Sequence, residues 1–274
     1  MSNLATGLPA PWGEHDVHGG DIVSIDLGPL RLNLRLRDDE IWIATTRVET
    51  VETIEPVAPI ESGEPVDSES VDADWVRWPV PGGTRSVRLS PAFPNRTVVA
   101  QPEVPMRLVS GANARVFVRV PLWVRVSTGG GVVLTEVPTV ALSDTWLGGF
   151  TSGELCYWLG TTARRHVSDG IFTPNLAVCP LILSNRSGDE APVERLAVHV
   201  EHLTLYCDDG HFWSNDSRIR FRGAEEDSHI DLTDAPPSEV PGAVTVAEPR
   251  DGSPPGASRI LGFARLMALP GFGA

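Results

Sequence analysis

Residues 30–37 read LRLNLRLR, with leucine at every even position and a polar residue at every odd position. Residues 116–126 read VFVRVPLWVRV and place valine or leucine at every even position. Successive side chains of a β-strand point to opposite faces, so this period of two predicts strands with one buried and one exposed face. Pro121 predicts a sheet edge or a bulge in the second run, because proline cannot donate to a strand ladder.

Strand-like patterns continue at 176–183, 193–206 and 217–222, and glycines at 129–131 indicate a hairpin turn. The 26 glycines and 24 prolines of the 274 residues interrupt these patterns at short intervals, which favours many short strands over βαβ units. The sequence therefore predicts an all-β, antiparallel, sandwich-like fold. The one helical pattern is short and lies near the C-terminus, at 257–269.

The charge is uneven along the chain, whose net charge is −14. Residues 48–76 hold nine acids and residues 224–249 hold seven, and neither segment contains arginine. Both segments are rich in proline and poor in core-forming residues, which is typical of loops or linkers. The predicted organisation is a flexible N-terminus (1–20), a β module with the acidic loop 48–76 (21–105), a second β module (106–223), an acidic linker (224–256) and a short helix within 257–274.

Composition also excludes several classes of protein. No apolar run approaches the roughly 20 residues of a membrane span, so we expect no integral membrane protein. The acidic charge argues against nucleic-acid binding, which needs a basic surface. Cys156, Cys179 and Cys207 form no disulfide or metal pattern and indicate buried thiols in a reducing compartment. With no signal peptide visible, we expect a cytoplasmic location.

Three blocks of sequence together resemble the family called domain of unknown function 432, found in archaea and some bacteria. The blocks are RLSPAFPNRTVV at 88–99, VFVRVPLWV at 116–124, and EVPT, LSDTWLG and SGELCY at 136–139, 142–148 and 152–157. The resemblance spans roughly residues 20 to 225 and implies a shared fold without implying a reaction. Some family members are associated with genes of small-conductance mechanosensitive channels, which implies a membrane-adjacent partner.

The third block contains the main candidate site. Trp146 and Tyr157 offer flat apolar surface, Asp144 and Glu154 offer acids, and Arg164 offers an anion clamp. Two carboxylates near one loop also suit general acid–base catalysis. The alternative is a structural hairpin whose polar side chains bond to nearby backbone.

Other catalytic and metal motifs are weak or absent. His15 and His18 have metal-ligand spacing, but their glycine-rich surroundings equally indicate a solvated loop. The sequence contains no Gly-x-Ser-x-Gly elbow, Walker loop or dinucleotide-binding fingerprint. We therefore expect no cofactor.

Three predicted strands carry arginines on the face that alternation assigns to solvent. Those residues are Arg31, Arg35 and Arg37, then Arg115, Arg119 and Arg125, then Arg218, Arg220 and Arg222. One interpretation is that these arginines pair with acids, either from neighbouring strands or from the two acidic segments folded back on them. The other is that they form a face for an anionic partner. On this interpretation Arg119→Glu leaves folding nearly intact and weakens partner binding.

The leading interpretation is a non-enzymatic, cytoplasmic interaction or regulatory module with an unknown protein partner. Its expected binding surface combines the hairpin residues with Arg115, Arg119 and Arg125. The alternative is a hydrolase of a sugar or ester in which Asp144 and Glu154 act as acid and base. The two interpretations predict different geometries, because a hydrolase needs both carboxylates in one cleft.

Overall fold

The computed structural model describes residues 7–17, 20–47, 74–151, 153–223 and 228–252. It is 55% strand, and its described part contains only short 3₁₀ turns and no α-helix. The all-β prediction is therefore confirmed. The predicted C-terminal helix and residues 48–73 of the first acidic segment lie outside the described residues.

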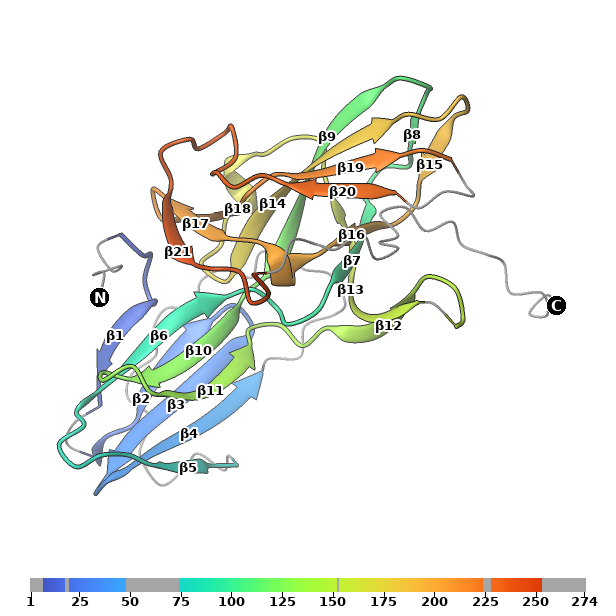
Figure 1. Cartoon of the computed structure of the whole chain (residues 1–274). Helices are drawn as coiled ribbons and strands as arrows, with labels where there is room; N and C mark the ends of the chain where they lie inside the picture. Colours follow the sequence, from blue (N-terminus) through green and yellow to red (C-terminus); the bar gives the residue numbers. More distant parts are fainter. Residues whose placement is uncertain (1–6, 18–19, 48–73, 152, 224–227, 253–274) are drawn as a thin grey trace.

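Two four-stranded sheets form a sandwich, seen in the lower part of Figure 1. One sheet has the order β1-β6-β10-β11 and the other β2-β3-β4-β5. The strand bounds are β1 (Gly13–Asp16), β2 (Val23–Leu27), β3 (Leu30–Arg37), β4 (Glu40–Arg47), β5 (Val76–Pro79), β6 (Ser86–Ala92), β10 (Trp123–Thr128) and β11 (Val133–Pro138). Leu30, Leu32 and Leu34 of β3 are fully buried, as the alternation predicts, and Leu36 is partly buried.

The rest of the chain forms the upper part of Figure 1. A seven-stranded sheet runs β20-β19-β14-β18-β17-β21, with β9 also paired to β14, and a four-stranded sheet runs β12-β13-β7-β16. A small pair, β15-β8, completes it. The bounds are β7 (Val98–Pro102), β8 (Met106–Leu108), β9 (Asn113–Pro121), β12 (Ser143–Leu147), β13 (Glu154–Ala163), β14 (Leu176–Asn185), β15 (Ala191–Val193), β16 (Leu196–Val198), β17 (Leu205–Asp208), β18 (His211–Ser214), β19 (Ser217–Phe221), β20 (His229–Leu232) and β21 (Val244–Ala247).

The chain passes between the two parts at three neighbouring places. Residues 93–97 join β6 to β7, Leu122 joins β9 to β10, and residues 139–142 join β11 to β12. At the middle crossing, the backbone N–H of Leu122 donates to Asn175 O at 2.9 Å, and Thr139 donates to Leu122 O. Pairing of β6 with β10, and of β7 with β13 and β16, links strands on either side of residue 105, where the sequence suggested a module boundary.

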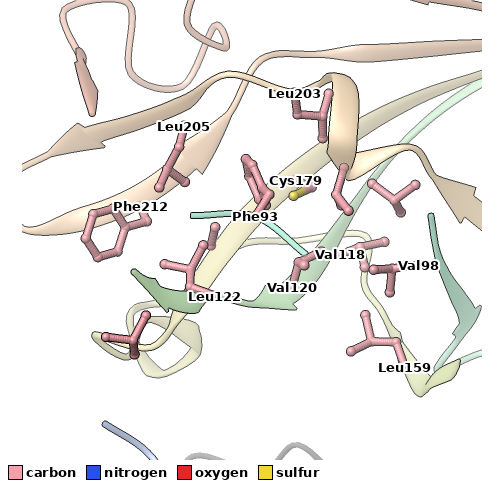
Figure 2. Close-up of a cluster of buried hydrophobic side chains, with 14 of the residues drawn as sticks. Phe93, Val98, Val118, Val120, Leu122, Leu159, Cys179, Leu203, Leu205 and Phe212 are labelled. Atoms are coloured by element: carbon pink, nitrogen blue, oxygen red, sulfur yellow. The ribbon is translucent and has the colours of Figure 1, made fainter. Parts of the chain in front are cut away.

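A continuous apolar core fills both parts. Figure 2 shows its upper region, where Val118, Val120 and Leu122 lie in one cluster with Val98, Leu205 and Phe212. Burying side chains of this size contributes about 1.5–3 kcal/mol each. All three cysteines are free and buried, as their spacing predicted.

Three predicted elements differ in the structure. Within the predicted flexible N-terminus (1–20), residues 13–16 form β1, which pairs with β6, and Trp12 and Val17 pack in the core. The expected long strand at 193–206 is divided into β15, β16 and β17, which pair with β8, β7 and β18 respectively. A 3₁₀ turn at Val200–His202 redirects the chain between the last two. The described part of the predicted linker 224–256 contains β20 and β21, which join the seven-stranded sheet because Ile230, Val246 and Ala247 pack on the core.

Candidate functional site

The hairpin formed by β12 and β13 projects from the body of the protein (Figure 1). Its antiparallel register pairs Asp144 with Tyr157, Trp146 with Leu155, and Leu147 with Glu154. The other edge of β13 runs parallel to β7, and Tyr157 N–H donates to Thr97 O at 2.9 Å. The hairpin is therefore anchored along β13, while β12 forms the edge of its sheet.

This register separates the two acids of the predicted catalytic pair. Asp144 lies three residues from Leu147, the partner of Glu154, and side chains alternate between faces of a strand. Asp144 and Glu154 therefore project from opposite faces of the hairpin. The paired-carboxylate site that the sequence suggested is not formed, because sequence proximity does not fix the face to which each side chain points.

Asp144 instead forms part of a cluster with Tyr157. Arg96 Nη1 lies 3.2 Å from Asp144 Oδ1, and the Arg96 guanidinium lies 5.2 Å from the Tyr157 ring centroid. The Tyr157 hydroxyl donates to Asn95 Oδ1 at 2.9 Å. Arg164 lies outside this cluster, where its side chain pairs with Glu103. The hairpin thus brings Asp144 and Tyr157 together. Arg96 contacts both of them and Asn95 contacts Tyr157, and neither Arg96 nor Asn95 was predicted as a site residue.

An apolar strip follows one face of the hairpin. It consists of Trp123, Tyr157, Leu155 and Trp146. The ring centroids of Trp123 and Tyr157 are 6.4 Å apart, Leu155 is on the same face two residues from Tyr157, and Trp146 lies opposite Leu155. Trp146 and Leu155 are 48% and 46% exposed, and Phe150, at the hairpin tip, is 96% exposed.

The indole of Trp146 is held in place at the tip. Its Nε1–H donates to Gly149 O at 3.1 Å, and the same carbonyl accepts Gly153 N–H at 2.7 Å. A Cβ at Gly153 would collide with the indole nitrogen of Trp146 and with Leu147 O, so the close packing requires glycine. The exposed ring is therefore presented in a fixed position.

The other end of the strip is fixed by a polar network. Arg250 lies 5.5 Å from the Trp123 ring centroid, donates to Phe93 O at 2.6 Å, and pairs with Glu136 at 2.7 Å. Arg125 also pairs with Glu136, at 2.6 Å, so it does not stand alone on the surface. Burial by itself raises the pKa of Glu136, but the hydrogen bonds from Arg250 and Arg125 outweigh it and hold that pKa below its ordinary value.

A buried polar cluster lies beside the same crossing. Thr97 Oγ1 donates to Glu201 Oε1 at 2.9 Å and lies 2.9 Å from Nδ1 of the buried His199. Burial raises the pKa of Glu201, but His199 and Thr97 outweigh it and lower that pKa overall. Burial, with the nearby Glu154 and Glu201, raises the pKa of the Cys156 thiol to about 12, so this thiol is protonated near pH 7 and is a poor nucleophile.

The arginine rows do not form one exposed face. Arg31, Arg35 and Arg37 lie on β3 and Arg125 lies on β10, in two different sheets, whereas β9 and β19 belong to the seven-stranded sheet. Arg119 is 3% exposed, which corrects the prediction that it points to solvent. The face of β9 that carries Arg119 and Phe117 is covered, because Phe117 packs in a cluster with Tyr206 and Trp213, against which Val240 lies.

Acids from the second acidic segment do fold back on the arginines. Both Glu239 oxygens accept hydrogen bonds from Arg115, at 2.8 and 2.6 Å, and Asp216 accepts another from Arg115 at 2.7 Å. Asp231 pairs with Arg220 at 2.7 Å. Arg115 and Arg220 are therefore neutralised within the protein, as one of the two interpretations of the sequence expected.

The described residues place no second metal ligand beside His15, so they do not support the metal site suggested by His15 and His18. His15 Nε2 lies 2.7 Å from Pro11 O, and His18 falls outside the described residues. Across the described ranges, no group of three or more His, Cys, Asp or Glu side chains is arranged to hold a metal ion. The helical turns of those ranges also lack the length and apolar character of a membrane-spanning helix.

The chain matches a known protein family. Residues 11–264 match the family model described as "Protein of unknown function (DUF432)". No curated protein and no solved structure matches the chain. Because the match covers most of the 274 residues and includes the blocks that form the crossings and the hairpin, the chain belongs to the DUF432 family.

Proposed function

We propose that this protein is a non-enzymatic interaction module that docks a cytoplasmic protein partner through the β12–β13 hairpin. The observation that carries the proposal is the exposed apolar surface of Trp146, Leu155 and Phe150 on a projecting hairpin. Large apolar side chains gathered in one exposed place typically mark an interaction site. Docking that buries Phe150 alone would contribute about 1.5–3 kcal/mol.

The fixed position of Trp146 supports a docking role. Its bond to Gly149 O and its close packing on Gly153 order the indole before any partner arrives. A preordered side chain loses less conformational entropy on binding, so more of the burial energy appears as affinity. Tryptophan is also among the residues that most often dominate binding energy at interfaces.

Charge favours a basic, apolar protein surface over an anionic membrane. The hairpin carries Glu154 on one face and Asp144, paired with Arg96, on the other, and it contains no arginine between residues 143 and 163, while the whole chain has a net charge of −14. Anionic headgroups attract basic segments, so they would repel this hairpin. A protein with an apolar groove bordered by lysine or arginine complements both the tip and its flanking acids.

Site-specific photo-crosslinking in native cells tests this proposal. A benzoylphenylalanine replaces Phe150 in the full chain, and a matched control replaces Val132, which is 57% exposed and lies in the turn between β10 and β11. We expect a defined protein adduct from position 150, absent from position 132 and lost when Trp146→Ser is added. Identical adducts from both positions, or adducts to phospholipid alone, would contradict the proposal.

A further inference from the structure

The apolar strip continues from the hairpin tip to the place where the described chain ends. Trp123 marks the inner end of the strip, and Arg250 lies over its ring. The next residue, Asp251, is held by its N–H, which donates to Glu201 O at 2.9 Å. Residues 253–274 therefore leave the described structure close to the inner end of the strip.

The composition of residues 253–274 complements the strip. This segment contains two arginines, Arg259 and Arg265, and no acid, in a chain that is otherwise strongly acidic. Its apolar residues are concentrated between positions 260 and 269. The strip offers apolar surface with a border of mixed charge, because the 59% exposed Asp144 pairs with Arg96, and Arg250 lies over Trp123. The apolar residues of the tail match the strip, and its positive charge matches the net negative charge of the rest of the chain.

Length also fits. Two residues along β13 separate Tyr157 from Leu155, and one strand spacing separates Leu155 from Trp146, so the strip with Trp123 extends about 15–20 Å. The helix that the sequence predicts at 257–269 would be about 20 Å long. Four residues separate position 252 from its start, enough to reach across about 13 Å when extended. The family match extends to residue 264, so it includes most of this segment.

We infer that residues 253–274 dock on the apolar strip of the same chain and compete there with the partner. The inference rests on the proposed function, because it uses the same surface and assigns it a regulator. The tail has the basic and apolar character that the proposed partner needs, so it acts as an internal substitute for that partner. Partner binding then requires displacement of the tail.

Intramolecular crosslinking of the full chain tests the inference without any partner. Benzoylphenylalanine replaces Leu155, and peptide mapping locates the adduct. We expect adducts between position 155 and residues 253–274, with a yield that does not change on tenfold dilution. The same group at position 132 should give no tail adduct. The full-chain variant Arg259→Glu with Arg265→Glu should lower the yield at least about fivefold.

Several results would overturn the inference. Adducts from position 155 that never include residues 253–274 would do so. Tail adducts found only between two chains, with a yield that falls on dilution, would assign the strip to a second copy instead. An unchanged yield in the charge-reversed variant would remove the electrostatic basis. Failure of the proposed function is a separate result, because loss of an external partner leaves the intramolecular adduct intact.

Discussion

Replacing Arg119 by glutamate should strongly destabilise the protein, which reverses the outcome expected from the sequence. Arg119 is 3% exposed in the middle of β9, opposite Val178 of β14. A carboxylate there would be buried at a position shaped for a guanidinium, and an uncompensated buried charge costs about 3–5 kcal/mol. That is a large part of the 5–15 kcal/mol typical of a whole domain.

Urea unfolding followed by tryptophan fluorescence measures this effect. With a urea dependence of about 3 kcal/mol per molar, the midpoint should fall by at least about 1 M. Arg222→Glu is the matched control, because Arg222 is exposed and the change should stay within about 0.5 kcal/mol. If both variants unfold at the wild-type midpoint, Arg119 is not buried and our description of the β9 face is wrong.

Three further changes test other parts of the structure. Gly153→Ala should lower the free energy of unfolding by about 1–3 kcal/mol and displace the Trp146 indole, which would shift its indole N–H resonance in an NMR spectrum. An unshifted resonance would contradict the close packing. Glu136→Gln should destabilise the protein above pH 5, and its difference from wild type in unfolding free energy should shrink as pH falls from 6 to 3, because a lowered folded-state pKa gives stability that protonation removes; a constant difference would argue against the ion pairs. Arg115→Met should cost about 3–5 kcal/mol in urea unfolding because it leaves Asp216, with a 10% exposed side chain, unpaired, whereas a loss below 1 kcal/mol would show that this pair is not essential.

The sequence predicted single strands well and their neighbours poorly. The alternation in residues 30–37 matches β3 at both ends, because a half-buried strand requires that pattern. The alternation in 116–126 crosses a break at Leu122, where the chain passes from one sheet to another. Pro121 signalled the irregularity, but an alternating pattern fits any sheet and does not identify the strands beside it.

The same limit explains the error at Arg119. Alternation separates the two faces of a strand but does not show whether a second layer covers the polar one. On β9 that layer includes Val240, which packs near Phe117 and lies more than 100 residues further along the chain. Val240 belongs to the predicted linker 224–256. The proline and acid content of that segment indicated a linker, and its few apolar residues did not predict this packing.

Part of the candidate site could be predicted from local sequence. The turn-forming residues around Gly148 and Gly153 indicated a hairpin, which brings Trp146 and Leu155 together. Arg96 and Arg250 could not be assigned to the site, because their contacts join segments about 50 and 130 residues apart. The positions of acids and aromatic rings in the sequence do not predict which arginine will contact them in the folded protein.

The most direct test of a docking role for the hairpin is the dissociation constant of the purified complex with the protein crosslinked at position 150. Phe150→Ser should weaken binding about 10- to 100-fold, which corresponds to the loss of one buried apolar side chain. Val132→Ser, at a similarly exposed position away from the hairpin, should leave the constant unchanged. Equal dissociation constants for wild type and Phe150→Ser would show that the hairpin tip is not the docking surface.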